Sequence, residues 1–293
     1  MSDSEPKFLV TGGGGQLATS LDQRIENGVV LPASRLDITD RDAVFRAIRE
    51  HRPEVVVNAA AYTQVDRAES EPVLAHAVNV TGVEHLATAC REVGARFVQI
   101  STDFVFSGDE TTPRRPEDPT GPASVYGRTK LSGEEISIDI LGDRALVVRT
   151  AWLYAAGHAN FVATMIRLMS ERDEISVVCD QTGSPTWIET LSGGLLDLVQ
   201  GGAGGIYHLT DSGEASWYEF ALAIEEMGRD AGILEKPCRV NPIPTADYPT
   251  PATRPSYSVL DKSKTTEKLG MSTPHWRTSL ARCLNEWQAN ENP

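Results

Sequence analysis

The sequence predicts an α/β fold: a Rossmann-like, doubly wound parallel sheet with a smaller α/β substrate lobe in the C-terminal half. Short apolar runs alternate with helical patterns up to about residue 150, and a glycine-rich turn joins the first run to the first helix. Beyond that point β-branched runs become fewer and polar turns more frequent. With 293 residues, the chain is long enough for a nucleotide-binding domain and a smaller partner.

The predicted strands are continuous apolar runs. Such runs, without alternation of polar and apolar residues, are typical of strands that are covered on both faces of a parallel sheet. The runs are "KFLV" at 7–10, "EVVVNAAA" at 54–61, "RFVQIS" at 96–101 and "ALVVRT" at 145–150.

Helical spacing of apolar residues predicts two helices between these runs and a third in the C-terminal half. Gly94 is placed to end the second helix, and the third is expected to end near Gly228. The apolar positions are Ala43, Val44, Ala47 and Ile48, then Val83, Leu86, Ala87 and Cys90, then Trp217, Phe220, Ala221 and Ile224.

A proline-rich stretch, "KPCRVNPIPTADYPTPATRPSY", occupies 236–257. Because its prolines fix many φ angles, we expect an ordered loop or a linker rather than a helix or a central strand. We predict a nucleotide-binding domain of residues 1–151 plus about 186–210. The substrate lobe then comprises residues 152–185 plus about 211–293 and closes over the carboxyl edge of the sheet.

Composition limits the classes of partner. A count of 27 Lys and Arg against 41 Asp and Glu gives a net charge of −14, which argues against a nucleic-acid surface. The chain shows neither a leader pattern nor an apolar run that could cross a bilayer, so we expect a cytoplasmic protein without a membrane partner. We expect a homodimer, because isologous dimers are the commonest oligomers of soluble proteins.

The cysteines are scattered, without a C-x-x-C pair or histidines at metal spacing. We therefore expect neither a disulfide framework nor a zinc site, and interpret the cysteines as buried free thiols. They are Cys90, Cys179, Cys238 and Cys283.

The glycine-rich turn "FLVTGGGGQLATSL" places Gly12, Gly15 and Ala18 as G-x-x-G-x-x-A between a strand and a helix. Small residues there let the backbone approach a pyrophosphate, which then meets the positive end of the helix dipole. A flexible connection is the alternative, but strand, spacing and helix together indicate dinucleotide binding.

The cofactor type depends on the residues that follow the second strand, in "LPASRLDI". Ser34 and Arg35 stand where an acid would bind the ribose 2′-hydroxyl of NAD, and a hydroxyl with a guanidinium suits a 2′-phosphate. This favours NADPH. Asp37 follows closely enough to leave NADH open.

Tyr126 and Lys130 in "VYGRTKLSGE" stand four residues apart at the start of a predicted helix, and therefore share one face. We expect the ammonium to lower the pKa of the phenol from about 10, so that the tyrosine donates a proton to a carbonyl oxygen that receives hydride. Thr102, with Ser101 at the end of a predicted strand, is the proposed third member that holds the carbonyl oxygen. A solvent-exposed pair is the alternative for Tyr-x-x-x-Lys alone, but the combination with the glycine-rich turn indicates an extended short-chain dehydrogenase/reductase.

The chain resembles the dTDP-4-dehydrorhamnose reductase family nearly from end to end. Two of the similar segments, the alanine- and acid-rich one and "DQTGSPT", are particular to this group. The similar segments are "GQLA", "VVNAAAYTQVDRAESEP", "STDFVFSG", "VYGRTKLSGE", "RTAWLY", "NFVATM", "DQTGSPT", "GIYHLT" and "RPSYSVLD".

The resemblance implies reduction of a 4-keto-6-deoxy sugar on dTDP by NADPH or NADH. Catalysis falls on Thr102, Tyr126 and Lys130. With the residues discussed above, the implied cofactor contacts are Gly12, Gly15, Gln16, Leu17, Arg35, Asp37, Ile38, Ala60, Ala61, Tyr62, Thr63, Tyr126 and Lys130. The implied substrate contacts are Thr102, Asp103, Phe104 and Trp152.

One departure from the family concerns the substrate: Phe104 stands where the family usually has tyrosine, so a hydroxyl near the sugar is missing.

Asn160 and Phe161 either hold the nucleotide or form a helix cap and a core aromatic. Arg254 either binds the diphosphate or is a solvent-exposed loop residue. An acidic cluster of Asp66, Glu69 and Glu71 is better explained by helix starts than by a metal site, and we predict no metal.

Three alternatives to this reductase remain. An epimerase or 4,6-dehydratase of the same fold would retain its NAD, and a dehydratase would want a further carboxylate after Asp103, where Phe104 stands. A reductase of different C4 stereochemistry is the second alternative. A non-catalytic NADP-binding regulatory subunit is the third, although such a subunit has no need of a tuned phenol.

Overall fold

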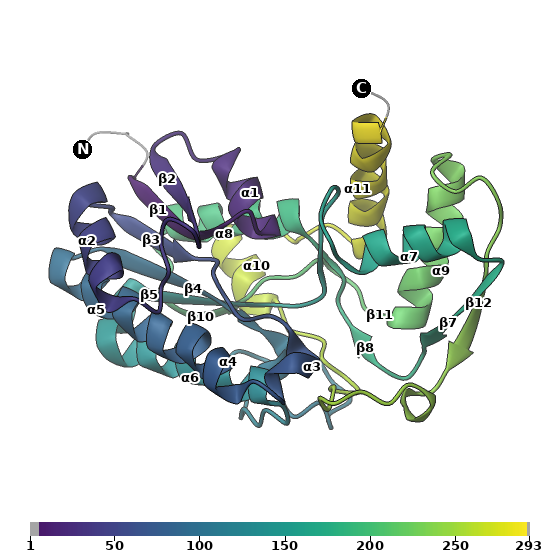
Figure 1. Cartoon of the computed structure of the whole chain (residues 1–293), viewed down its shortest axis with the longest axis horizontal. Helices are drawn as coiled ribbons and strands as arrows, with labels where there is room; N and C mark the ends of the chain where they lie inside the picture. Colours follow the sequence, from purple (N-terminus) through teal and green to yellow (C-terminus); the bar gives the residue numbers. More distant parts are fainter. Residues whose placement is uncertain (1–5, 292–293) are drawn as a thin grey trace.

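A computed structural model describes residues 6–291, which contain a central sheet of six parallel strands (Figure 1). Their spatial order is β10, β5, β4, β3, β1, β2, so the chain winds outward in both directions from β1 and β3. The predicted α/β fold with a parallel sheet is confirmed. The strands are β1 (Phe8–Gly13), β2 (Gly28–Pro32), β3 (Val55–Asn58), β4 (Arg96–Thr102), β5 (Ala145–Thr150) and β10 (Gly205–His208).

Both faces of the sheet are covered by helices, which explains the continuous apolar runs. In β4, Phe97 packs towards one face and Val98 towards the other. One face packs against α2 (Arg41–His51), α5 (Gly82–Val93) and α6 (Val125–Leu141). The other packs against α1 (Gln16–Asp22) and α8 (Ile188–Gln200), and α10 (Ser263–Leu269) adjoins α8.

The C-terminal half adds a smaller layered unit, drawn in green and yellow in Figure 1. There β7 (Glu174–Val178) pairs in parallel with β12 (Arg239–Ile243). Its helices are α7 (Phe161–Glu171), α9 (Trp217–Asp230) and α11 (Trp276–Glu291). The short strand pairs are β6 (Leu153–Tyr154) with β9 (Thr186–Trp187), and β8 (Thr182–Gly183) with β11 (Ala215–Ser216).

The chain leaves the sheet after β5 and returns to it with α8 and β10. The domain limits set out above remain a prediction. Short elements complete the described chain: helices α3 (Val65–Ala68) and α4 (Pro72–His76), a π-helical turn at Ala77–Thr81, and 3-10 turns at Asp103–Val105, Gly142–Arg144 and Thr245–Asp247.

The predicted helices agree with α2, α5 and α9, and Gly94 ends α5 with a φ of 79°. The prediction for the proline-rich stretch was wrong at Arg239–Ile243, which forms β12. Pro242 is accommodated because β12 has a strand partner on one side only, so that alternate amide groups need no ladder bond. α9 also continues to Asp230, past Gly228.

All four cysteines are free, but Cys179 is exposed, which contradicts the expectation that every thiol is buried. It follows the last residue of β7 and donates its amide to the carbonyl of Ile243, so its side chain lies outside both cores. Within residues 6–291, none of the helices has the length and apolar character that a membrane span requires.

Candidate active site

A cavity of about 1000 Å³ lies at the carboxyl ends of β1, β3, β4 and β5. Its wall is formed by residues of the glycine-rich turn, the segment after β2, the ends of β3 and β4, and α6. The predicted catalytic, cofactor and substrate residues all lie in this wall except Arg35 and Tyr62, and the further candidates Ser34, Asn160 and Phe161 lie outside it. The cavity therefore joins segments that are more than 200 positions apart, from Gly12 to Arg254.

The glycine-rich turn brings the backbone of β1 close to that of the chain after β3. Gly12 has a φ of 74°, and a Cβ there would lie 2.7 Å from the backbone of Ala59 and Ala60. Gly15 is the N-cap of α1 and brings no side-chain cap to the helix. The result is a backbone cradle of the kind that accepts a pyrophosphate.

The two exceptions lie outside the wall, and their contact with the cofactor stays a prediction. Arg35 is exposed and lies outside the cavity wall, whereas Asp37 belongs to it. The Asp37 carboxylate accepts bonds from the amide and the hydroxyl of Thr39, at 2.9 and 2.7 Å. Tyr62 is buried with its hydroxyl donating to Glu71 at 2.8 Å, so its phenol points elsewhere.

Tyr126 and Lys130 lie on one face of α6 and both line the cavity, as predicted. Ser124 caps the helix by accepting the amide of Gly127 at 3.1 Å. A Cβ at Gly127 would lie 2.3 Å from the carbonyl oxygen of Phe104, so glycine is required for this helix start to dock on the turn after β4. The Lys130 ammonium donates to the carbonyl of Ile100 at 2.6 Å.

The electrostatics of this pair differ from the expectation. Burial raises the pKa of Tyr126 to about 12, although the Thr102 hydroxyl opposes the rise. Burial lowers the pKa of Lys130 to about 8, opposed by the charge of Glu134. The expected lowering of the phenol pKa was wrong for the protein alone, because loss of water dominates and the ammonium is bonded to Ile100 instead.

Thr102 and Asp103 end β4 at the cavity floor. The Thr102 hydroxyl donates to an Asp103 carboxylate oxygen at 2.9 Å and accepts the amide of Phe104 at 3.2 Å. Burial raises the pKa of Asp103 to about 6, while the hydroxyls of Ser258 and Thr102 oppose the rise. The second carboxylate oxygen of Asp103 accepts no hydrogen bond among the described residues, and Asp103 belongs to the cavity wall.

A buried polar chain crosses the sheet beneath the cavity. The Thr11 hydroxyl donates to Asn58 at 2.6 Å, and the Asn58 amide donates to Gln99 at 2.9 Å. Gln99 in turn donates to the Ile100 carbonyl, which also receives the Lys130 ammonium. The lysine is thereby fixed relative to the glycine-rich turn on β1.

An aromatic stack forms another part of the wall. The indole of Trp152 lies 3.4 Å from that of Trp217 with 3° between the rings, and Trp152 has a φ of 49°. Gly183 makes room for it, since a Cβ there would lie 2.5 Å from the Trp152 ring. From the sequence, Trp217 was predicted only as an apolar position of its helix, and it lies at the first residue of α9.

Asn160 and Phe161 have the structural roles considered above, a helix cap and an aromatic packing contact. Asn160 caps α7 by accepting the amide of Ala163 at 3.1 Å, and its side-chain amide donates to Gln16 at 3.1 Å. Phe161 packs on Trp217, with 4.6 Å between ring centroids.

Arg254 reaches the cavity and is not an isolated surface residue. Its guanidinium binds both carboxylate oxygens of Asp66, at 2.9 and 2.6 Å. Of the other acids in the cluster, Glu69 accepts the amide of Val125 at the start of α6 and Glu71 accepts the hydroxyl of Tyr62. Residues 6–291 contain no group of three His, Cys, Asp or Glu side chains arranged to hold a metal.

The glycine-rich cradle and the group of Thr102, Tyr126 and Lys130 share one cavity at the carboxyl edge of a parallel sheet. This combination defines an NAD(P)H-dependent oxidoreductase of the extended short-chain dehydrogenase/reductase class.

Comparison with known proteins identifies the family within this class. The RmlD substrate binding domain family matches residues 6–289. The dTDP-4-dehydrorhamnose reductase of Streptomyces griseus is 47% identical over 287 residues, covering 94% of this chain and 92% of that protein.

Solved structures agree. The dTDP-4-dehydrorhamnose reductase of Clostridium acetobutylicum has a TM-score of 0.90 at 38% identity, covering 96% of this chain and 99% of that one. The reductase of Bacillus anthracis, solved in complex with NADP, has a TM-score of 0.91 at 35% identity, covering 97% and 100%. The chain belongs to the dTDP-4-dehydrorhamnose reductase family.

Proposed function

We propose that the chain reduces the C4 keto group of dTDP-4-dehydro-L-rhamnose to give dTDP-L-rhamnose, with NADPH as the reductant. The observation that carries this proposal is the meeting of Thr102, Tyr126 and Lys130 with the glycine-rich turn in one cavity. NADPH, when bound, supplies the hydride.

In this proposal the Tyr126 hydroxyl donates the proton to the C4 oxygen, and Thr102 hydrogen-bonds the same oxygen. Lys130 binds the nicotinamide ribose and provides positive charge near the phenol. Because burial raises the pKa of Tyr126 to about 12 in the protein alone, the phenol stays protonated and is ready to donate. The unpartnered hydroxyls of Ser101 and Thr150 in the same cavity fit a polar ligand.

The cofactor is held by the cradle of residues 12–17, with Asp37 and Ile38 near the adenine side and residues 60, 61 and 63 further along the wall. The NADP bound to the Bacillus anthracis relative supports NADPH. Asp37 in the wall and Arg35 outside it keep NADH as the second candidate, so the two are compared in the same assay.

The dTDP-sugar is bound by the remaining wall. Arg254 and Lys130 are the arginine and lysine side chains among the described residues of the wall, and Lys130 is bonded at the cavity floor. Arg254 is therefore the proposed partner of the diphosphate, for which it exchanges its bond to Asp66. Trp152 offers a flat face to the thymine or the deoxy sugar, and Phe104 lies edge-on to Tyr126 with 5.7 Å between centroids.

The test follows absorbance of NADPH, then NADH, with enzymatically generated dTDP-4-keto-6-deoxy-L-mannose, and identifies the product sugar by NMR. Oxidation matched mole for mole by dTDP-L-rhamnose supports the proposal. A C4-epimeric product would instead point to Phe104 and a talose-type reductase. Cofactor binding without oxidation would indicate the regulatory subunit, and turnover without net cofactor consumption would indicate an epimerase or dehydratase.

A further inference from the structure

Helix α6 carries a third buried ionisable side chain in line with Tyr126 and Lys130. Glu134 follows Lys130 by four residues, as Lys130 follows Tyr126, so the three lie along one face of the helix. Lys130 is 3% exposed and Glu134 is 1% exposed. Tyr126 and Lys130 line the cavity, whereas Glu134 lies one turn behind it.

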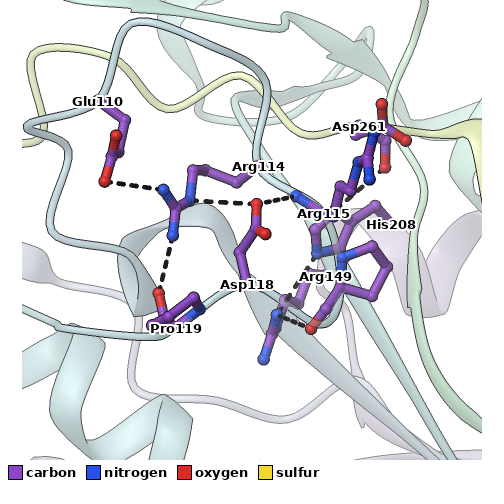
Figure 2. Close-up of polar contacts among 9 residues, drawn as sticks. Glu110, Arg114, Arg115, Asp118, Pro119, Arg149, His208 and Asp261 are labelled. Atoms are coloured by element: carbon purple, nitrogen blue, oxygen red, sulfur yellow. Dashed lines mark hydrogen bonds and ion pairs between the residues drawn. The ribbon is translucent and has the colours of Figure 1, made fainter.

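Arg149 on β5 fixes the Glu134 carboxylate. Its Nε and Nη2 donate to the two carboxylate oxygens at 2.9 and 2.7 Å. Its Nη1 donates to the carbonyl of Pro116 at 3.2 Å and lies 3.5 Å from Nε2 of His208, whose other ring nitrogen meets the carbonyl of Asp261 (Figure 2). The Glu134 carboxyl group is thus held at a fixed position.

A buried ion pair of this kind adds little net free energy to the stability of the fold. Burying two charges costs free energy that their attraction often only offsets, and apolar residues of similar volume frequently serve as well. The Glu134 charge is therefore better explained by its effect on a neighbouring ionisable group. The next ionisable group towards the cavity on the same face of the helix is Lys130, which has no carboxylate within ion-pair distance among the described residues.

We propose that Glu134, held by Arg149, is a positioning residue that keeps the Lys130 ammonium protonated inside the dry active site. The link to reduction rests on the function proposed above, but the effect on Lys130 does not. A lysine exposed to water is protonated at neutral pH without a neighbouring negative charge. In this cavity, loss of water favours the neutral amine, and a fixed negative charge one helical turn away offsets that loss.

The other groups around Lys130 do not supply this charge. Burial lowers the pKa of Lys130 to about 8, and Glu134 is the charge that opposes this fall. Asp103, on the turn after β4, has a pKa raised to about 6 and acts on Tyr126. On α5, which packs against α6, burial raises the pKa of Cys90 to about 12. On β10, His208 is kept neutral by burial and by Arg149, with its pKa lowered to about 3.

The test measures the pKa of Lys130 directly. The chain has six lysines, so [13Cε]lysine NMR of the full protein gives few signals, and Lys130→Met assigns the one of interest. Glu134→Gln removes the charge but leaves Arg149 unpaired in the interior, which endangers folding. The double variant Glu134→Gln with Arg149→Gln removes both charges and avoids that risk. Arg149→Lys is the matched control, because it perturbs the packing and keeps both charges.

We expect the pKa of Lys130 to fall by about 1 unit in the double variant and to stay near the wild-type value in Arg149→Lys. The basic limb of the pH profile of kcat should move with it, so that kcat falls about fivefold at pH 8 and is nearly unchanged at pH 6. A folded double variant with the wild-type pKa at Lys130, or an equal shift in Arg149→Lys, would overturn the proposal and leave Arg149 and Glu134 a purely structural pair. If the wild-type enzyme fails to reduce the keto sugar, only the proposed function fails, since the NMR titration needs no turnover.

Discussion

Two parts of the cavity wall are built in contrasting ways. The glycine wall, residues 12–17, is one continuous stretch whose shape is set by backbone conformation and close approach to the chain after β3. The remote wall, which we define as Trp152, Trp217 and Arg254, is assembled from side chains of separate segments by stacking and by the ion pair of Arg254 with Asp66. A short local pattern therefore specifies the first, whereas the second exists only once the chain has folded.

The largest effect is expected from a change that leaves both walls intact. Tyr126→Phe removes the proton donor and keeps the ring that meets Phe104. We expect kcat to fall by about 10³-fold, because general acid catalysis is lost, while the affinity for NADPH is retained. Stopped-flow turnover and fluorescence titration of NADPH measure the two quantities. Activity within tenfold of wild type would show that Tyr126 is not the acid.

The variant Asp103→Asn measures how much a buried charge on the cavity floor lowers the stability of the fold. Its folded pKa, about 6, lies above the ordinary aspartate value of 3.8, so the stability it contributes is present below pH 4 and is lost as the pH rises through 6. Asp103→Asn should therefore be more stable than wild type at pH 7.5 by up to about 3 kcal/mol, with the difference vanishing near pH 4. Urea unfolding from pH 4 to 8 measures it.

The matched control for that experiment is Asp109→Asn, an exposed aspartate in the following loop. It removes a carboxyl group outside the cavity wall and so measures the effect of such a substitution alone. If Asp103→Asn and wild type differ by a constant amount at every pH, the carboxyl group is not titrating in the native state as described.

The glycine wall is broken by Gly12→Ala. A Cβ would lie 2.7 Å from the backbone of Ala59 and Ala60, and the φ of 74° is itself unfavourable for alanine. We expect a loss of about 2 kcal/mol in NADPH binding, or about thirtyfold in Kd. Gly14→Ala is the control, since its φ of 89° carries similar strain but no atom lies within 4 Å of the added Cβ. Equal losses in both variants would assign the effect to strain rather than to the close approach.

The remote wall is tested by Arg254→Lys. Lysine keeps the charge but loses the fork that binds Asp66 and, in our proposal, the diphosphate. We expect KM for the dTDP-sugar to rise about tenfold, with kcat and NADPH affinity nearly unchanged. Arg67→Lys, an exposed neighbour on α3 paired with Glu71, is the control. A change in NADPH affinity instead would place Arg254 on the cofactor.

The same contrast explains what the sequence could predict. The sheet, α2, α5, α6 and the glycine-rich turn follow from local periodicity and spacing, and so does the shared face of Tyr126 and Lys130. Arg35 lies outside the wall of the cavity, because motif spacing fixes the position of the strand end and not the direction of a side chain beyond it; its contact with the cofactor stays a prediction. The direction of the Tyr126 pKa was wrong because burial depends on the whole cavity.

Contacts across long sequence separations could not be predicted for the same reason. Asp66 and Arg254 are 188 positions apart, and the stack joins Trp152, just before β6, to Trp217 at the start of α9. Glu134 lay within the quoted helix motif, yet its meaning required Arg149 from β5. A lone carboxylate on a helix face ordinarily faces solvent, and nothing local distinguishes this one.

The smallest effect is expected at the edge of the remote wall. Trp217→Leu removes one partner of the stack while Ser216 still caps α9, so the fold should survive. Trp152 then loses the indole that holds its plane, and we expect KM for the dTDP-sugar to rise about threefold, in line with the modest value of one aromatic contact. Trp217→Phe should restore most of the affinity because it keeps a ring. If both variants bind the dTDP-sugar as wild type does, Trp152 is held by Gly183 and its own backbone alone, and the remote wall is smaller than we have defined it.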